Sequence, residues 1–473
     1  MNTIWRPILA ERDGPKYKAL ADAIRIAIGD GALEVGQKLP PVRDLAWDLQ
    51  ITPGTVARAY TVLTDQGVLE AAVGRGTFVA PPAGDAPPIA TPLRPIEVDV
   101  VPHGTYSDPA GWNLVSPGLP DVGQAQLIRD LMGEIAANPR SGVMHYPNAA
   151  AFRPAREAVM HWLEGTPLGA LDQEDIVLTH GGQNGLCLAL QSVLRGTRPV
   201  VLVEELCYPG FRRAAELLRA DIAAVPLDAE GLIPEAIEAL ARRHDVQALL
   251  TSPEVHNPTG AFTPQHRRHQ IAALAQQYDF QIIEDDCYRL GASRAPSYRM
   301  LAPDRGWYVS SISKTLTPAL RIGFAIAPKP HVAALRRSAE FGFFGLATPL
   351  GDLTARLLKD PRTSYLADQI KQHFGRYVQT CVNHLGRHDL TWHVDVPYVW
   401  LRLPDGWRTS AFCQAAAARN IQIRPAEDYA GREGKTPHAV RIAINAQISL
   451  AHFEKAMIQL SELLDNPSER IGV

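Results

Sequence analysis

Residues Ser310 to Phe324 read SSISKTLTPALRIGF and combine a nucleophile with a phosphate-binding pair. The apolar run Trp307 to Val309 precedes them and is typical of the end of a buried strand. Lys314 is the candidate nucleophile, because a lysine amine attacks a carbonyl carbon only when neutral, and partial desolvation beside another cation favours that state. Ser311 and Arg321 supply a hydroxyl and a planar guanidinium that together can hold a phosphate. Such a pairing is what pyridoxal 5'-phosphate (PLP) requires.

Two other interpretations fit the same letters. The S-x-x-K pattern also occurs in serine β-lactamases and penicillin-binding proteins, which carry S-D-N and K-T-G elsewhere. This chain contains neither motif. The second alternative is a surface lysine that follows a strand, so the rest of the sequence has to support a PLP site.

The composition indicates a multidomain globular protein. At 473 residues, 46% hydrophobic and 21% charged, the chain is too long for one ordinary domain. The net charge of -3 gives no overall attraction to nucleic acid or membrane. We see no secretory signal and no apolar run that would span a bilayer, so we expect a cytoplasmic protein. The five cysteines form no C-x-x-C pair, which favours reduced thiols over a disulfide framework or a metal site.

Residues 1–80 predict three helices and a hairpin. Thr52 is suited to cap the third helix, with Pro53 at its first position. The hairpin turns at Gly74-Arg75-Gly76 and forms a wing. The expected helices cover 16–29, 42–49 and about 54–66, and the expected strands cover 68–73 and 77–80. Two helices joined by a tight turn make a helix-turn-helix.

Three motifs cover nearly all of this segment: G-x-x-L-P-x-x-R-x-L-A, T-V-x-x-A-Y and G-R-G-T-F-V. They resemble the winged helix-turn-helix of the GntR family of bacterial repressors, a small α+β domain. The resemblance implies that the third helix enters the major groove of a double-stranded DNA operator and the wing approaches the minor groove. The implied DNA contacts are Arg43, Thr52, Thr55, Arg58, Arg75 and Gly76. The alternative is an interaction module without a DNA role, because nine Lys/Arg balance nine Asp/Glu over residues 1–80.

Residues 81–112 contain eight prolines. Proline at this density favours an extended, semi-rigid spacer between two folded units. The alternative is an edge segment of the larger unit, in which Ile96 to Val101 make one short strand.

From Asn113 onward, apolar β-rich runs alternate with helical patterns, which predicts a parallel sheet covered on both faces. Ligands in such sheets bind at the carboxyl ends of the strands. The strand-like runs are 175–178, 200–203, 248–250, 280–283 and 307–309, and the clearest helical patterns cover 183–195 and 265–278.

Residues suited to a flat, phosphorylated ring follow these runs. Gly182 and Gln183 open a helix whose free amides can bind a phosphate. Tyr208 can stack on a ring, and Asn257 can donate to a ring hydroxyl. A carboxylate at Asp285 can keep a pyridine nitrogen protonated. Each residue alone has an ordinary alternative in a turn or in the core, so their joint order carries the prediction.

Near the C-terminus, Arg441 lies in the apolar run Ala439 to Ala443. A buried arginine needs a partner, and a ligand carboxylate is a natural one. Together with the residues above, the segment from about Asn113 to the C-terminus resembles the fold-type I aminotransferases. The resemblance implies an α/β domain with a mostly parallel sheet and Lys314 as the Schiff-base lysine.

The same resemblance implies the roles of the other residues. Asp285 would pair with the pyridinium nitrogen and Tyr208 would stack on the ring, which makes them the catalytic partners of Lys314. The implied cofactor contacts are Asn257 and Tyr288 at the ring hydroxyl; Gly182, Gln183, Ser311 and Arg321 at the phosphate; and Tyr146 from the partner subunit of a homodimer. Arg441 would bind the carboxylate of a substrate or effector, with Gly118 beside it.

A GntR-like head (1–80), a linker (81–112) and an aminotransferase-like domain (113–473) resemble the architecture of the MocR/GabR subfamily of bacterial regulators. That resemblance implies a PLP-dependent, DNA-binding homodimer that regulates transcription. It would sense an amino-acid-like effector, or PLP itself, through internal and external aldimines at Lys314. The sequence leaves one alternative from another class open: a working aminotransferase that converts amino acids to keto acids and carries a DNA-binding head.

Overall fold

The computed structural model describes residues 5, 16–72, 76–80, 111–138, 144, 146–147, 150–431, 434 and 436–466, apart from the side chains of 65, 71 and 72. The chain divides into two compact units, Met1–Ser107 and Asp108–Val473. Arg75, the predicted strand Ile96 to Val101 and the proline-rich stretch up to residue 110 lie outside the described residues.

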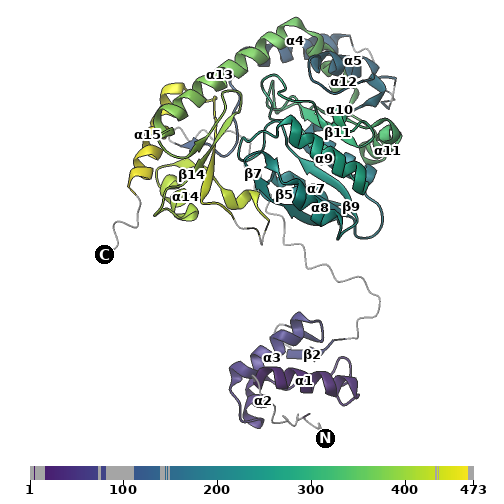
Figure 1. Cartoon of the computed structure of the whole chain (residues 1–473), viewed down its shortest axis with the longest axis vertical. Coiled ribbons are helices and arrows are strands. Elements are labelled where there is room, and N and C mark those ends of the chain that lie inside the picture. Colours follow the sequence, from purple (N-terminus) through teal and green to yellow (C-terminus); the bar gives the residue numbers. More distant parts are fainter. Residues whose placement is uncertain are drawn as a thin grey trace. The chain divides into compact units, whose positions relative to one another are not determined.

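The first unit has the predicted helices and hairpin (Figure 1). Its elements are α1 (Lys16–Gly29), α2 (Val42–Asp48), α3 (Pro53–Asp65), β1 (Leu69–Ala72) and β2 (Gly76–Val79). The strands β1 and β2 pair antiparallel. Thr52 caps α3 as predicted, because its Oγ1 accepts a hydrogen bond from the backbone N of Thr55 at 3.3 Å, and Pro53 occupies the first helical position. The predicted face of α3 is buried: Val56, Ala59, Tyr60 and Leu63.

The second unit is built on a seven-stranded sheet in the order β4-β12-β11-β10-β9-β5-β6. Its strands are β4 (Ile176–Thr179), β5 (Val200–Glu204), β6 (Asp221–Val225), β9 (Val246–Thr251), β10 (Gln281–Asp285), β11 (Gly306–Ser311) and β12 (Gly323–Ile326). The predicted mostly parallel sheet is confirmed, since β12 alone among these strands runs antiparallel to both its neighbours.

Both faces of this sheet are covered, which explains why its strands are apolar without alternation. Val201 and Val203 pack with α6 (Gly181–Val193), α7 (Pro209–Leu217) and α11 (Val332–Phe343). Leu202, between them, packs on the opposite face with α8 (Pro234–Ala241), α9 (Gln265–Tyr278) and α10 (Tyr298–Leu301). That opposite face continues over β4 and β12, where α4 (Gln124–Ala137), α5 (Arg153–Trp162) and α12 (Thr348–Lys359) cover it.

A smaller antiparallel sheet, in the order β13-β14-β17-β16, completes the second unit. Its strands are β13 (Leu390–Thr391), β14 (Tyr398–Arg402), β16 (Arg424–Pro425) and β17 (Ala439–Ala443). The long helix α13 (Pro361–Leu385) extends from beside α12 to α15 (Leu450–Asp465), and α14 (Thr409–Ala417) lies near the smaller sheet (Figure 1). The remaining short elements are β3 (Trp112–Asn113), β7 (Leu227–Asp228), β8 (Gly231–Leu232), β15 (Ile421–Gln422) and the 3-10 turns Gln173–Asp175, Lys329–His331 and Ala426–Tyr429.

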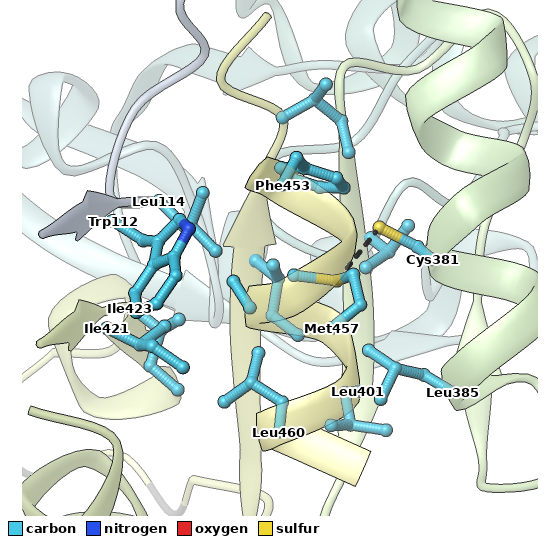
Figure 2. Close-up of a cluster of buried hydrophobic side chains, with 14 of the residues drawn as sticks. Trp112, Leu114, Cys381, Leu385, Leu401, Ile421, Ile423, Phe453, Met457 and Leu460 are labelled. Carbon is cyan, nitrogen blue, oxygen red and sulfur yellow. Dashed lines mark hydrogen bonds between the residues drawn. The ribbon is translucent and has the colours of Figure 1, made fainter. Parts of the chain in front are cut away.

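The core of this smaller part joins α13, α15 and the strand that follows the linker (Figure 2). Met457 and Phe453 of α15 are fully buried, and the thiol of Cys381 lies 3.5 Å from the sulfur of Met457. Trp112 of β3 packs in the same cluster, and its ring stacks on His452 with centroids 4.8 Å apart. The start of the second unit is therefore held by its C-terminal helix.

No helix among the described residues is both long and apolar enough to cross a bilayer.

We expect Phe453→Ala to lower the free energy of unfolding of the second unit by about 3–5 kcal/mol, because a fully buried aromatic ring leaves a cavity. Denaturant unfolding followed by tryptophan fluorescence measures this change. The matched control is Ile458→Ala on the same helix, where the side chain is 41% exposed and we expect a change within about 0.5 kcal/mol. Equal effects of the two substitutions would contradict the assigned packing.

Candidate functional site

The candidate site lies at the carboxyl edge of the large sheet. The parallel strands β5, β9, β10 and β11 end at that edge, and each is followed by a residue that the sequence singled out. Because β12 runs antiparallel, its first residues start at the same edge, and this places Arg321 beside the ends of the other strands. Arg321 adopts a left-handed backbone conformation with φ of 50° as the chain turns into β12.

Three glycines form a close-fitting cradle at this edge. A Cβ on Gly181 would lie 2.5 Å from Nη2 of Arg321, and one on Gly182 would lie 2.4 Å from Sγ of Cys287. A Cβ on Gly323 would lie 2.6 Å from the backbone of Gly181. Among the described residues, no side chain caps α6 from its N-cap position, His180, and uncapped N-terminal amides are suited to an anion.

Hydroxyl and guanidinium groups surround the start of α6. Ser311 is buried at the end of β11, and its Oγ donates to Sγ of Cys287 at 3.5 Å. Arg321 is exposed, and its Nη1 donates to Oγ of Ser313 at 3.5 Å. Burial, and then the charge of Arg321, lower the pKa of His180, so the residue before α6 stays neutral at pH 7. Hydroxyl and guanidinium groups of this kind are suited to hold a phosphate.

Asp285 lies at the last residue of β10 and is buried. Its Oδ1 accepts a hydrogen bond from the backbone N of Cys287 at 3.0 Å. Burial raises the pKa of Asp285 to about 6, which is a large rise for an aspartate. Burial likewise raises the pKa of the Cys287 thiol well above its usual value, so this cysteine stays protonated.

Lys314 and Tyr288 meet at the centre of the site. Nζ of Lys314 lies 5.4 Å from the centroid of the Tyr288 ring. Burial alone would raise the pKa of Tyr288, but Lys314 and Arg441 together lower it below its usual value. Two nearby cations therefore favour the ionised form of this phenol.

Arg441 joins this centre from the smaller sheet. Its guanidinium is 2% exposed and lies over the rings of Tyr398 and Tyr429, at 5.1 and 5.2 Å. Its Nη1 donates to Oδ1 of Asn257 at 2.7 Å. Because the amide oxygen of Asn257 is used by Arg441, its amide nitrogen is the donor that it can offer to a ligand. No carboxylate of the described residues lies within 4.0 Å of this guanidinium. Its Nε has no hydrogen-bond partner there either.

Arg441 also holds the segment that begins the second unit. Its Nη2 donates to the backbone O of Val115 at 2.7 Å. Three residues later along the chain, the backbone N of Gly118 donates to the backbone O of Ile444, the residue after β17, at 3.0 Å. A Cβ on Gly118 would lie 2.1 Å from Oδ1 of Asn445, so only glycine fits this approach.

Tyr208 and Gln183 both contact Gly210. Gln183 donates from Nε2 to the backbone O of Gly210 at 2.9 Å. A Cβ on Gly210 would lie 2.0 Å from Oε1 of Gln183 and 2.1 Å from the Tyr208 ring. Burial raises the pKa of Tyr208, so its phenol stays protonated.

Tyr146 is the predicted site residue that the structure does not bring to this cluster. Its side chain is 85% exposed, and its described ring contact is with Phe344, at 5.9 Å between centroids. Phe344 is itself 67% exposed. Such an exposed aromatic pair leaves Tyr146 free to contact a second copy of the chain.

The predicted DNA contacts lie in the first unit. Arg43 is exposed on α2, and the guanidinium of Arg58 lies 4.3 Å from the ring centroid of Tyr17. Thr52 and Thr55 share a hydrogen bond between their hydroxyls at 2.9 Å. Gly76 has a φ of 119°, and a Cβ there would lie 2.6 Å from Cε of Lys38.

Sequence reasoning did not assign roles to Tyr398, Tyr429, Cys287 or Val115. Tyr398 lies in the apolar stretch 396–401, which is typical of an ordinary core strand, and Tyr429 follows the acidic pair Glu427-Asp428, which is typical of a turn. Cys287 stands inside the EDDCY motif, and its spacing from Asp285 was the signal available. Val115 contacts Arg441 through its backbone carbonyl. Every residue has such a carbonyl, so the residue type gave no signal.

Taken together, these groups fit PLP. The glycine cradle and the free end of α6 suit its phosphate, and Asp285 is a buried carboxylate of the kind that keeps a pyridine nitrogen protonated. The amine of Lys314 lies near the ring of Tyr288.

Two family models match the chain. Residues 118–460 match the model described as aminotransferase class I and II. Residues 16–79 match the model of bacterial regulatory proteins of the gntR family.

The chain is also similar to whole regulators of transcription. It is 25% identical to the HTH-type transcriptional regulator YdeF of Bacillus subtilis over 469 residues, covering 98% of this chain and 97% of YdeF. It is 31% identical to the HTH-type pyridoxine biosynthesis transcriptional regulator PdxR of Corynebacterium glutamicum, covering 74% of this chain and 72% of PdxR. The 2-aminoadipate transaminase of Thermus thermophilus is 28% identical over 64% of this chain and 75% of the transaminase.

Solved structures share the fold of the second unit. The α-aminoadipate aminotransferase LysN of Thermus thermophilus superposes with a TM-score of 0.67 and 21% identity, over 76% of this chain and 94% of LysN. An archaeal alanine:glyoxylate aminotransferase gives a TM-score of 0.66 and 23% identity, over 75% and 91% of the two chains. The expected fold-type I aminotransferase architecture is thereby confirmed.

We expect Asp285→Asn to stabilise the protein without PLP above about pH 6. The carboxyl has a pKa of about 6 when folded and 3.8 as a free group, so the folded state binds more protons between those values. Stability is therefore lost as the pH rises from about 4 to 6, by about 3 kcal/mol. Urea unfolding at pH 4 and pH 8 measures the free energy of unfolding, and Asp285→Asn should remove the decrease of about 3 kcal/mol that this carboxyl causes. Asp304→Asn, at an exposed position, should keep it. A pH dependence unchanged by Asp285→Asn would contradict the assignment of this buried carboxylate.

Proposed function

Because the chain belongs to the aminotransferase class I and II family and, with its GntR head, to the MocR-type regulators of transcription, we propose that it is a PLP-dependent sensor of a small amine. In this proposal residues 1–80 bind an operator, 81–112 link the two parts, and 113–473 bind PLP and form a homodimer. The ligand is an amino-acid-like compound whose binding changes the affinity of the protein for DNA.

One observation carries the proposal: the two hydrogen bonds of Arg441. One reaches Asn257 at the predicted cofactor site, and the other reaches the carbonyl of Val115, three residues after Trp112. The same guanidinium thus contacts the ligand site and the segment that continues from the linker. A ligand carboxylate that takes either donor has to change one of these contacts.

PLP, when bound, supplies an aldehyde that captures amines and a conjugated ring that absorbs visible light. Lys314 is the amine of the protein that would hold it, and Asp285 would keep the ring nitrogen protonated. Gly182, Gln183, Ser311 and Arg321 would hold the phosphate, with Tyr208 packed on the ring. Asn257 would donate from its amide nitrogen to the ring hydroxyl, and Tyr288 would lie next to that oxygen and Lys314. In the proposed homodimer, Tyr146 would complete the phosphate site of the partner subunit.

An amino acid would be recognised by its carboxylate at Arg441. The guanidinium is buried against neutral groups, and a buried charge gains most from an ionic partner. When the carboxylate binds, Val115 loses or shares its donor. Trp112 and Leu114 are fixed to Asn420 and Gln422 of the neighbouring chain segment by backbone hydrogen bonds of 2.8 Å, so a shift at Val115 strains this short parallel pair.

A ligand changes DNA binding only through its differential affinity for two arrangements of the protein. The Val115 segment supplies two such arrangements, with and without its bond to Arg441. The similarity to PdxR also supports PLP itself as the ligand, because PdxR is named as a transcriptional regulator of pyridoxine biosynthesis. A DNA-binding assay with PLP alone and with PLP plus amino acids separates the two versions.

A second candidate function is transamination itself. The presence of all the residues that the family resemblance assigns to catalysis, Lys314, Asp285 and Tyr208, supports this alternative. Amino acids mixed with the PLP-loaded protein and a keto-acid acceptor decide between the two. Many turnovers to keto acid per protein would support the enzyme, whereas one stable spectral change without turnover supports the sensor.

We expect Lys314→Ala to abolish the visible absorption band that lysine-linked PLP gives, while the protein stays a folded dimer. Absorption spectra after addition of PLP, with gel filtration for the oligomeric state, test this. Lys329→Ala is the control, because Lys329 is an exposed lysine that pairs with Asp175 at 3.0 Å. A band that survives Lys314→Ala would refute the central assignment.

We expect Arg441→Gln to weaken the binding of amino acids about 10- to 100-fold, because a charge-assisted pair to the carboxylate is lost. Spectral titration of the PLP-loaded protein measures the affinity. The matching amines without a carboxylate should bind the variant and the unchanged protein alike. Arg402→Gln, on the exposed end of β14, should leave both affinities unchanged. Equal losses for amines and amino acids would show that Arg441 does not recognise the carboxylate.

A further inference from the structure

The exposed face of α3, the helix expected to enter the major groove, is almost free of available polar side chains. Its exposed positions are Pro53, Gly54, Ala57, Arg58 and Thr61. Three of these residues have no polar side chain at all. A Cβ added to Gly54 would meet only the hydroxyl oxygen of Thr52, at 3.9 Å, so the helix is open to close approach on this side.

The hydroxyls on and next to this face are already hydrogen-bonded within the protein. Thr52 and Thr55 bond to each other at 2.9 Å, and Thr52 also accepts from the backbone N of Thr55. Thr61 donates to the backbone O of Ala57 at 3.0 Å. Thr61, and whichever of Thr52 and Thr55 donates within their pair, would have to give up a hydrogen bond in order to donate to a base. The accepting partner of the pair keeps its own O–H.

Arg58 is the one remaining strong donor among the described side chains of this face. Its guanidinium lies 4.3 Å from the Tyr17 ring, a cation–π contact that fixes the side chain against α1. Basic side chains most often position a DNA-binding domain by contacting phosphates, whereas contacts to the edges of the bases give sequence specificity. The face therefore offers one positioned cation and a small apolar surface centred on Ala57.

We propose that α3 reads its operator mainly by apolar contact with the C5-methyl groups of thymine, with Ala57 as the central contact. This inference rests on the proposed DNA-binding function of the head. Alanine and threonine methyl groups pack against the thymine methyl in the major groove, and this contact distinguishes thymine from the other bases without any hydrogen bond. The absence of a side chain at Gly54 lets the helix approach closely enough for such contacts.

The test uses the full-length PLP-loaded protein and a library of random DNA duplexes. Sites are enriched by binding, and the best site is resynthesised with deoxyuridine in place of each thymidine. We expect the enriched half-sites to contain thymine. Each deoxyuridine that replaces a contacted thymidine should lower the affinity about fourfold, which is the effect of leaving one methyl group unburied. A second duplex with 7-deazaguanine tests hydrogen bonding to N7, and we expect no loss outside contacts of Arg58.

The variant Ala57→Gly sharpens the test, because the deoxyuridine penalty should vanish at one position of each half-site. The control Ala23→Gly, a half-buried position on α1, makes the same change in helix propensity and should keep the full penalty. Circular dichroism shows that both variants fold.

Three results would overturn the inference. Equal affinity for thymidine and deoxyuridine sites would refute methyl reading while the DNA-binding function stands. A penalty that Ala57→Gly leaves unchanged would refute the assigned contact. A library without any enriched sequence would refute the DNA-binding function as well as this inference.

Discussion

The buried guanidinium of Arg441 is the constraint on which the second unit depends. It lies between two tyrosine rings and has only neutral hydrogen-bond partners in the part of the chain that the structure describes. A buried charge without an ionic partner is unfavourable, and it persists only where several groups hold it in place. Asn257 comes from the large sheet and Val115 from the start of the unit, so one side chain links three parts of the fold.

The large sheet contributes the rest of the site through its topology. Strands that end at one edge bring together residues far apart in the sequence, and the single antiparallel strand returns Arg321 to that edge. The glycines at 181, 182 and 323 allow backbone and side chains to approach within distances that no Cβ would permit. The close approach of the chain segments at this edge therefore depends on the absence of side chains at these three positions.

Much of this arrangement could be predicted from the sequence. The helix bounds of α1 and α9, the capping of α3 by Thr52 and the apolar strands of the parallel sheet follow from periodicity and local chemistry. The antiparallel course of β12 could not be predicted, because a buried strand of either direction is uniformly apolar. The bond between Arg441 and Val115 involves a backbone carbonyl and a separation of 326 residues, so no local pattern encodes it. The roles of individual site residues stay predictions, since they depend on a bound ligand.

The measurement that tests the account most directly is hydrogen exchange at residues 112–115. The amides of Trp112 and Leu114 are bonded to Asn420 and Gln422, so their exchange reports how firmly this segment is held. We predict that PLP together with the effector amino acid changes their exchange rates, and that Arg441→Gln abolishes the change. Exchange that changes only at the cofactor residues, with 112–115 unaffected, would contradict the claim that Arg441 couples the ligand site to the segment following the linker.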